Sequence, residues 1–256
     1  MALLIFAFIC GAVVGSFLNV CIHRVPAGAS IVSPASHCPQ CGTPIRSRDN
    51  VPLLSYLLLR GRCRACGTRI SLRYPVVEAL TGILSALVAY RVGWSPLLAV
   101  DGLLIAALIA ISFIDFDHQI IPDVISLPGI VVGVACAAAG YGPSLADSLI
   151  GVLLGGGLLY AVAAGYAAVT GREGMGGGDI KLLAMIGAFL GWRGVLVTVV
   201  LGSLGGSLVG GALMLTRHLG SRVPIPFGPF LAAGAVCALF FGDALIAWYF
   251  HLVIPV

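Results

Sequence analysis

The run PLLAVDGLLIAALIAISFI, residues 96–114, decides the fold class, because it is long and apolar enough to cross a membrane as a helix. Two acidic residues, Asp115 and Asp117, follow it within the sequence IDFD. The whole chain of 256 residues has the same character, with 59% hydrophobic and 9% charged residues and a mean hydropathy of +1.08. Soluble domains carry roughly 25% charged residues. The composition therefore predicts an integral membrane protein.

Seven further apolar segments flank this run, so the sequence predicts an all-α polytopic membrane protein with about eight transmembrane helices. The eight segments are Ala2–Cys21, Pro75–Tyr90, Pro96–Ile114, Ile120–Ala139, Ala146–Val169, Asp179–Trp192, Gly194–Leu215 and Ile225–Leu252. The segment that begins at Asp179 is short, and a helix of its length covers only about 21 Å of a hydrocarbon core of roughly 30 Å. In the next segment Gly202, Gly206 and Gly210 recur every fourth residue, which predicts one helix face that packs closely against a neighbour.

The distribution of Lys and Arg predicts the orientation of these helices. If residues 23–74 are cytoplasmic, twelve of the 14 basic residues lie inside and only Arg91 and Arg193 lie outside. Both termini then face outward, and Asp179 begins its segment at the cytoplasmic surface. The formal charge of +4 thus has a topological cause, so we expect a lipid bilayer and no nucleic acid as the chain's surroundings.

Two Cys-x-x-Cys pairs lie in the one long polar insertion, residues 23–74. Cys38 and Cys41 form the first pair, Cys63 and Cys66 form the second, and 21 residues separate the pairs. This spacing is typical of a four-cysteine zinc ribbon, and thiolates in a reducing cytosol more often hold metal than form disulfides. Zinc bound by four cysteines has no open coordination position, so the sequence predicts a structural ion and no hydrolytic metal. The alternative is four structural thiols without metal.

Four carboxylates have the surroundings that catalysis requires. Asp115, Asp117 and Asp123 cluster where one apolar segment ends and the next begins, and Asp179 begins a later segment on the same side of the membrane. Two carboxylates that share a proton can hydrolyse an amide, since one accepts a proton from water while the other donates one. The remaining acidic residues have structural explanations, either as helix-end or bundle-facing groups or as solvated groups in basic loops (Glu78, Asp101, Asp147 and Asp243, and Asp49 and Glu173).

The choice among the first three carboxylates stays open on physical grounds. Asp115 continues its helix directly, which favours a rigid side chain, whereas Asp123 follows a proline and is suited to cap or orient. His118 is expected to be a hydrogen-bond partner of a carboxylate. The glycines that precede Asp179, Gly176, Gly177 and Gly178, leave room for another backbone to approach it.

The motifs of this chain resemble those of the type IV prepilin peptidases, a family of GxGD-type membrane aspartic proteases that also act as N-methyltransferases. The resemblance covers nearly the whole chain. It is carried by GSFLNVCIHRVP, the two cysteine pairs, ISLRYPVVEALTG, IDFDHQIIPDVISLP and GMGGGDIKLLAMIGAFLGW. It implies a first helix (1–22), a cytoplasmic zinc-binding module (23–74) and a transmembrane peptidase core (75–256).

The resemblance also implies residue roles and substrates. The two catalytic aspartates correspond to Asp115 and Asp179, with Asp117 and Asp123 in supporting roles. The implied substrates are prepilins or pseudopilins of type IV pili and type II secretion, cut at the cytoplasmic face of the bacterial inner membrane. Their basic leader is removed, and the new N-terminus is methylated from S-adenosyl-L-methionine, for which no site follows from these residues. Two other functions fit less well: a transporter or channel that uses intramembrane aspartates, and a non-catalytic pilin assembly platform.

Overall fold

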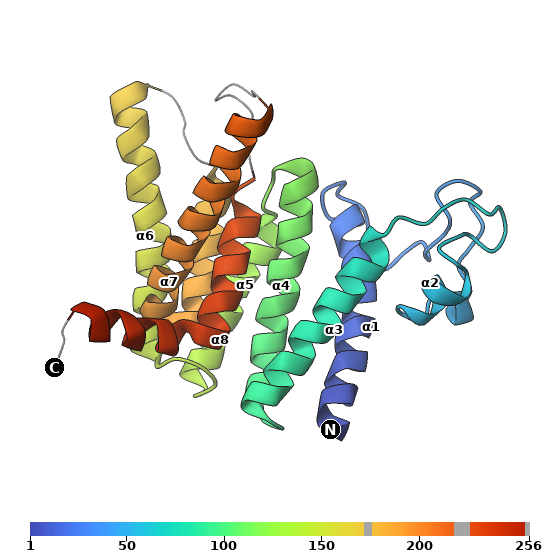
Figure 1. Ribbon diagram of the computed structural model, residues 1–256, viewed down its shortest axis with the longest axis horizontal. Coiled ribbons are helices and arrows are strands. Elements are labelled where there is room, and N and C mark those ends of the chain that lie inside the picture. Colours follow the sequence, from blue (N-terminus) through green and yellow to red (C-terminus); the bar gives the residue numbers. More distant parts are fainter. Residues whose placement is uncertain (172–175, 218–225, 254–256) are drawn as a thin grey trace. The chain divides into compact units, whose positions relative to one another are not determined.

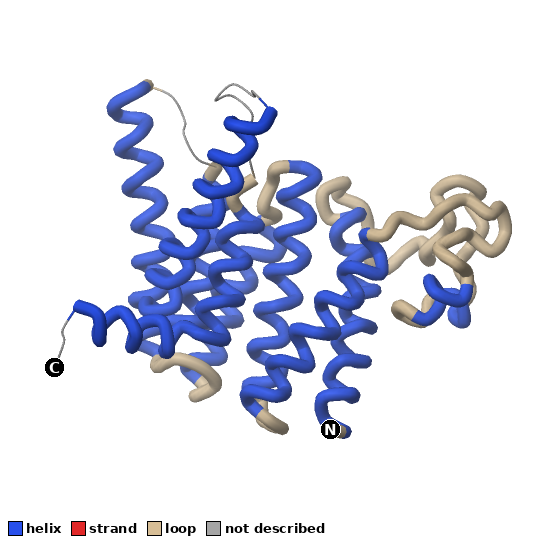
Figure 2. Tube along the Cα trace, in the orientation of Figure 1, coloured by secondary structure: helices blue, strands red, loops and turns tan. Residues whose placement is uncertain are grey.

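The computed structural model describes residues 1–171, 176–217 and 226–253, and these residues form helices and loops with no strand (Figures 1 and 2). The chain divides into two compact units, Met1–Ala110 and Ile111–Val256. Glu173 and Ile225 lie outside the described part, as do Arg172 and Arg222, two of the twelve basic residues predicted to lie inside. The division at 22/23 and 74/75 stays a prediction.

The first unit holds α1 (Ala2–Arg24), α3 (Arg73–Val92) and the polar module between them, which contains a short 3-10 turn (Ser47–Asp49) and α2 (Leu54–Leu58). Small residues let α1 and α3 pack closely. A Cβ atom on Gly15 would lie only 2.8 Å from the Cα of Glu78, and one on Gly11 would lie 2.8 Å from the carbonyl oxygen of Thr81. The first residues of α4 (Leu97–His118) also belong to this unit.

The second unit contains the end of α4, α5 (Asp123–Ala138), α6 (Leu145–Thr170), α7 (Gly177–Arg217) and α8 (Gly228–Val253). Each half of α7 packs on a different neighbour, the first half against α6 and α5 and the second half against α8. Within this unit, the end of α4 and the beginnings of α5, α7 and α8 lie at the same end, the upper end in Figure 1. This topology gathers residues that are far apart in the sequence.

Gly191 divides α7 into two helical segments. Its backbone is non-helical, with φ of 69° and ψ of 179°, a conformation that favours glycine. The predicted segments Asp179–Trp192 and Gly194–Leu215 are therefore the two arms of one helical hairpin, whose ends both lie at the upper end in Figure 1. The short first arm is wedged between α6 and α5 and is largely buried.

Six helices in the described residues are long and apolar enough to cross a membrane. The hairpin of α7 counts once in this number, and α5, with 16 residues, falls below the length required. The fold is the predicted all-helical membrane fold with a four-cysteine module after the first helix. The number of eight separate spans stays a prediction.

The glycines Gly202, Gly206 and Gly210 of the seventh predicted segment do not all pack closely against a neighbouring helix, as the sequence had predicted. Gly202 does pack closely, since a Cβ atom there would lie 3.1 Å from the carbonyl oxygen of Phe230. At Gly206 the expectation is wrong, because a Cβ atom would meet only the Phe227 and Phe230 rings at 3.7 Å, an ordinary contact distance. The backbones of α7 and α8 have already separated at this point.

The closest helix contact in the second unit lies elsewhere, between α6 and the first arm of α7. A Cβ atom on Gly151 would collide with the carbonyl group of Gly187, and one on Gly155 would lie 2.5 Å from the carbonyl oxygen of Leu183. The buried Ser148 hydroxyl adds a hydrogen bond of 2.8 Å to the carbonyl oxygen of Ala188. Backbones can approach in this way only where side chains are absent.

Candidate functional site

Asp115 lies one turn before the end of α4 and is only 5% exposed. Its Oδ2 accepts a hydrogen bond of 2.9 Å from the backbone N–H of Gly228, the first residue of α8. A buried carboxylate requires such partners, because an unpaired one is costly in an apolar environment. This bond holds the Asp115 side chain in one orientation.

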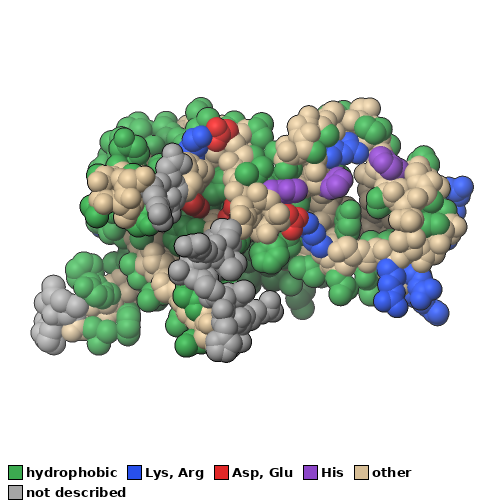
Figure 3. Space-filling view, turned by 90° about the horizontal axis from the view of Figure 1, so that it is seen from above, with side chains coloured by type: hydrophobic (Ala, Val, Ile, Leu, Met, Phe, Trp, Pro, Cys, Tyr) green, Lys and Arg blue, Asp and Glu red, His purple; other side chains and the backbone are tan. Residues whose placement is uncertain are grey.

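Asp179 is the third residue of α7 and is half-buried. Its neighbour Gly178 packs on Ile121, in the loop that follows α4, so Asp179 begins its helix at the end of the unit where Asp115 lies. The structure thus brings together two side chains that are 64 positions apart in the sequence. Acidic side chains and a basic one are visible on this end of the unit when it is seen from above (Figure 3).

The three glycines before Asp179 have different surroundings. Among the described residues, no atom lies within 4 Å of the position of a Cβ on Gly177, and a Cβ on Gly176 would have only an oxygen of Asp179 near it, at 3.9 Å. Gly178 instead faces Ile121, whose Cβ would lie 2.8 Å from a Cβ at Gly178. Among the described residues, the space beside Gly176 and Gly177 is therefore open. The group that approaches Gly178 is a side chain of the same molecule.

The other two candidate carboxylates are less buried than Asp115 and Asp179. Asp117 and Asp123 are both exposed. Lys181 on α7 donates hydrogen bonds of 2.7 and 2.8 Å to the two carboxylate oxygens of Asp123 on α5. This ion pair joins the beginning of α5 to the beginning of α7, the helix that carries Asp179. A role of Asp123 in orienting the site stays a prediction.

Gly228 is a site residue that the sequence analysis missed. A Cβ at this position would lie 2.7 Å from Oδ2 of Asp115, so the carboxylate occupies the space of a missing side chain. The available signal was the sequence Pro226-Phe227-Gly228-Pro229, a turn-forming pattern directly before an apolar helix. It could not indicate which acidic residue the glycine contacts.

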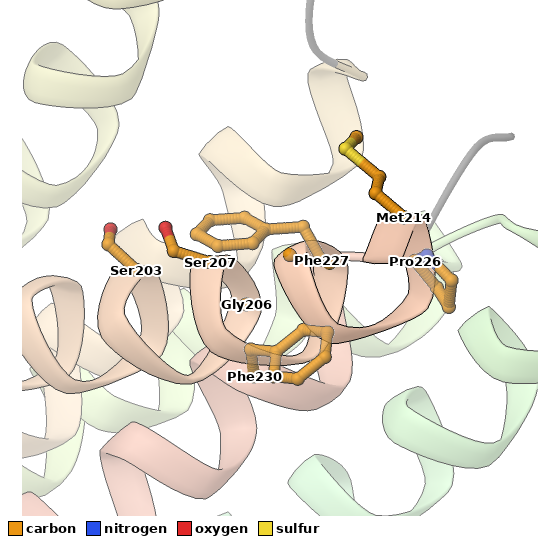
Figure 4. A pocket seen from close by; sticks show the side chains of 9 residues that line it. Ser203, Gly206, Ser207, Met214, Pro226, Phe227 and Phe230 are labelled. Atoms are coloured by element: carbon orange, nitrogen blue, oxygen red, sulfur yellow. The ribbon is translucent and has the colours of Figure 1, made fainter. Parts of the chain in front are cut away.

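A groove of about 570 Å³ lies next to Gly228, between the second arm of α7 and the start of α8. Figure 4 shows the Phe227 and Phe230 rings beside Gly206, with Ser203 and Ser207 along the same helix. None of the described residues that line it is charged.

The four cysteines of the polar module form one cluster, whose sulfur atoms all lie within 4.8 Å of one another. The two pairs have the same local structure. Cys38 and Cys63 each donate a backbone hydrogen bond to the carbonyl of a threonine five residues later, and their own carbonyls accept from Gly42 and Gly67 at 2.9 Å. Both glycines have positive φ, 69° and 71°, which the tight turn requires.

This cluster fits a tetrahedral zinc ion. Zn–S bonds of about 2.3 Å place neighbouring sulfur atoms about 3.8 Å apart, and the Cys38 and Cys66 sulfur atoms are 3.9 Å apart. Hydrogen bonds from Thr68 lower the pKa of the Cys66 thiol to about 6, which favours the thiolate that binds metal. The module can therefore hold a metal.

Two carboxylates stabilise this module, although the sequence predicted only a solvated group for one and a helix-end or bundle-facing group for the other. Asp49 was expected to be solvated, but Arg64 binds both of its oxygens at 2.7–3.0 Å, and this pairing lowers the pKa of Asp49. Glu78 on α3 is buried and accepts a hydrogen bond of 2.8 Å from the backbone N–H of Leu53. Leu53 has an unusual φ of 60° at the start of α2, so Glu78 fixes a strained loop onto α3.

Comparisons with known proteins match both parts of the chain. Residues 9–92 match the bacterial peptidase A24 N-terminal domain, and residues 102–211 match the type IV leader peptidase family. Three proteins called prepilin leader peptidase/N-methyltransferase are similar over most of their length. The protein from Aeromonas hydrophila is 40% identical over 94% of this chain and 92% of its own. Those from Stutzerimonas stutzeri and Pseudomonas aeruginosa are 41% and 40% identical, each over 97% of this chain and 94% of its own. No solved structure matches the chain.

Proposed function

The chain belongs to the type IV leader peptidase family, and we propose that it cleaves the leader from type IV prepilins or pseudopilins at the cytoplasmic face of the bacterial inner membrane. The observation that carries this proposal is that Asp115, held by the N–H of Gly228, and Asp179, whose neighbour Gly178 packs on Ile121, lie at the same end of an apolar bundle. Neither a transporter nor an assembly platform requires a peptidase-type pair of carboxylates.

Asp115 and Asp179 are the catalytic residues of this proposal. Two carboxylates whose charges repel favour a state with one proton between them. The ionised carboxylate accepts a proton from water, and the water oxygen forms a bond to the carbonyl carbon of the scissile peptide. The protonated carboxylate donates to the carbonyl oxygen. As the C–N bond breaks, the carboxyl group that took the proton from water donates it to the leaving amine, and the proton on the former carbonyl oxygen returns to the other carboxylate.

Gly228 and the glycines before Asp179 support this chemistry. The Gly228 N–H engages Oδ2 of Asp115, so proton transfer falls to its Oδ1. Gly176 and Gly177 leave the approach to Asp179 open for an extended substrate backbone. Gly178 contributes by packing against Ile121, which fixes the start of α7. Asp117 and Asp123 have supporting roles, Asp123 through its ion pair with Lys181.

Zinc is the metal that suits the four cysteines, because their sulfur spacing matches a tetrahedral ion (Cys38, Cys41, Cys63 and Cys66). The ion folds the polar module and takes no part in the cleavage. The module lies on the cytoplasmic side in the orientation that the Lys and Arg distribution favours.

N-methylation of the newly formed amine is the second activity, with S-adenosyl-L-methionine as donor by family resemblance. Among the described residues that line the groove between α7 and α8, none carries a charge that would bind the amino-acid group of this donor. We therefore derive no methylation step from these residues.

Incubation of the purified protein with a synthetic prepilin tests the proposal. Mass spectrometry should detect the free leader and the shortened pilin, and a further 14 Da on the new N-terminus when the methyl donor is added. An intact prepilin after prolonged incubation with folded protein would refute the peptidase assignment. Binding without cleavage would favour the assembly platform.

A further inference from the structure

The last turns of α8 leave the core of the second unit. Leu239 is buried, and none of residues 240–252 is. Figure 1 shows these turns, in dark red, running across the lower end of the unit instead of continuing in the direction of the first turns of α8. We call residues 242–253 the C-terminal segment. Because this segment has left the core, packing within the unit does not determine its surroundings.

An exposed carboxylate marks the place where α8 leaves the hydrocarbon layer. Asp243 is exposed, and a charged side chain that faces acyl chains is costly. In a straight helix, the residues from Ala244 to Leu252 would then extend about 14 Å farther into water, and their large apolar side chains would lose contact with lipid. A helix that turns into the membrane plane at Asp243 keeps these side chains at the lipid boundary. The direction of the C-terminal segment in Figure 1 agrees with such a turn.

The C-terminal segment has one narrow polar face. Asp243, Ala247 and His251 recur every fourth residue and therefore lie on the same side of the helix. The large apolar side chains beside this face are 55–62% exposed (Trp248, Tyr249, Phe250 and Leu252). Trp and Tyr are enriched where a membrane meets water. A helix with these properties is typical of one that lies in the plane of the interface.

We infer that the C-terminal segment of α8 lies flat in the membrane–water interface, at the end of the bundle opposite Asp115. Its aromatic and leucine side chains contact lipid, while Asp243 and His251 face water. The partner is the bilayer that other helices of the chain cross, so the segment requires no second protein to cover it. The inference does not depend on which substrate the protein cleaves.

This placement limits the part of α8 that crosses the membrane to residues 228–241. These 14 residues rise about 21 Å, compared with a hydrocarbon core of roughly 30 Å. The helix α5 is similarly short, with 16 residues, and a bilayer becomes locally thinner around short segments. The C-terminal segment also anchors the helix whose first residue, Gly228, binds Asp115.

Spin labels can compare depths along the C-terminal segment. A spin-labelled amino acid is incorporated at one position at a time in the full chain, in bilayers of phosphatidylethanolamine and phosphatidylglycerol. Power saturation with oxygen and a water-soluble nickel complex reports the depth of each label. Leu245 and Leu252 are seven residues apart, so they share a face and lie about 10 Å apart along the helix axis. Phe6 and Val13 on α1 are the matched control pair, with the same spacing and similar exposure, 53% and 54%.

We expect the labels at positions 245 and 252 to lie at the same depth, and a label at Ala247 to be accessible to nickel. The labels at Phe6 and Val13 should differ in depth by about 10 Å, as in a helix that crosses the membrane. A difference of about 10 Å between positions 245 and 252 would overturn the inference, because the segment would then continue straight out of the membrane. Labels shielded from both oxygen and nickel would also overturn it, because protein would then cover the segment.

Trp248 provides a second readout in a chain without spin labels. Its fluorescence is measured as the difference between the wild type and Trp248→Phe, in the same bilayers with lipids brominated near the headgroup end of the acyl chains. We expect these lipids to quench the difference signal, since a segment in the interface keeps Trp248 within their reach. Trp248 emission that these lipids leave unquenched would overturn the inference.

Discussion

The proposed mechanism depends on the orientation of a single side chain, that of Asp115. It is buried, and it accepts a hydrogen bond from the Gly228 N–H. Gly228 thus has two roles, since its N–H binds the carboxylate and its missing side chain leaves space for it. Substitution of Gly228 should affect catalysis before it affects the fold.

Gly228→Ala is expected to reduce kcat for prepilin cleavage by about 10²-fold, because the added Cβ would lie 2.7 Å from Oδ2 of Asp115 and must displace it. The helices should remain folded, and the melting temperature in detergent should change little. The control is Gly242→Ala, farther along α8, where no atom lies within 4 Å of the Cβ position. Normal turnover in Gly228→Ala would show that this contact does not position Asp115.

Sequence reasoning identified the carboxylates but could not select among them by physical argument. Asp115, Asp117 and Asp123 are the same residue type in similar local sequences. Their burial depends on helices formed by residues much later in the chain. The structure separates them, because α8 covers Asp115 while Lys181 of α7 binds Asp123. Gly228 was missed for the same reason, since its partner lies 113 positions away.

At the scale of helices, the bundle around the site depends on glycines that let backbones approach one another. The closest approach is between α6 and the first arm of α7, at Gly151 and Gly187. This contact positions the arm that begins with Asp179. The same residue type has the opposite role at Gly206, where the helices have separated and glycine leaves a groove open.

Gly151→Ala should lower the stability of the folded protein by about 1–3 kcal/mol, the usual cost of an extra methyl group in a well-packed contact. The reason is that the added Cβ would collide with the Gly187 carbonyl. Thermal unfolding in detergent measures the effect, with Gly157→Ala on the open side of the same helix as control. Equal melting temperatures for the two variants would contradict the packing account.

The helices themselves were predictable because a run of apolar residues in a membrane has few alternatives to helix. Their contacts were not, since a glycine repeat shows which residues share a face and leaves the neighbour of that face unspecified. The stripe Gly202, Gly206 and Gly210 was expected to pack along its whole length, whereas Gly202 approaches the backbone of α8 and Gly206 meets only aromatic rings at an ordinary contact distance. In the sequence, the only sign of the hairpin at Gly191 was that the predicted apolar segment Asp179–Trp192 is short.

At the scale of the whole molecule, the chain combines an apolar peptidase core with a polar module that is too small to form a large hydrophobic core of its own. The cysteine cluster, the Asp49–Arg64 ion pair and the Glu78–Leu53 hydrogen bond take the place of such a core. The cysteine spacing alone predicted this cluster, because metal geometry constrains spacing more strongly than helix packing does. The roles of Asp49 and Glu78 depended on tertiary contacts and were not predicted.

Protein purified without added metal should contain one zinc ion per chain, measured by elemental mass spectrometry. Cys38→Ser should reduce the metal content to near zero and lower the stability of the module, because folding and metal binding are linked. Turnover per folded molecule should change far less than it does when a catalytic aspartate is replaced. Cys237→Ser is the control, since Cys237 lies in α8 outside the cluster. Wild-type protein without metal, with all four module cysteines open to alkylation while folded, would contradict this account.

The measurement that tests the central claim most directly is prepilin cleavage by Asp115→Asn and Asp179→Asn, with folding verified by thermal unfolding. An amide neither accepts nor donates a proton as a carboxyl group does, so each variant should lose about 10²–10⁴-fold or more in kcat. Asp117→Asn and Asp123→Asn should have milder effects. Asp243→Asn, an exposed residue of α8, should cleave at the wild-type rate. Near-normal cleavage by folded Asp115→Asn or Asp179→Asn would remove that residue from the pair and contradict the account.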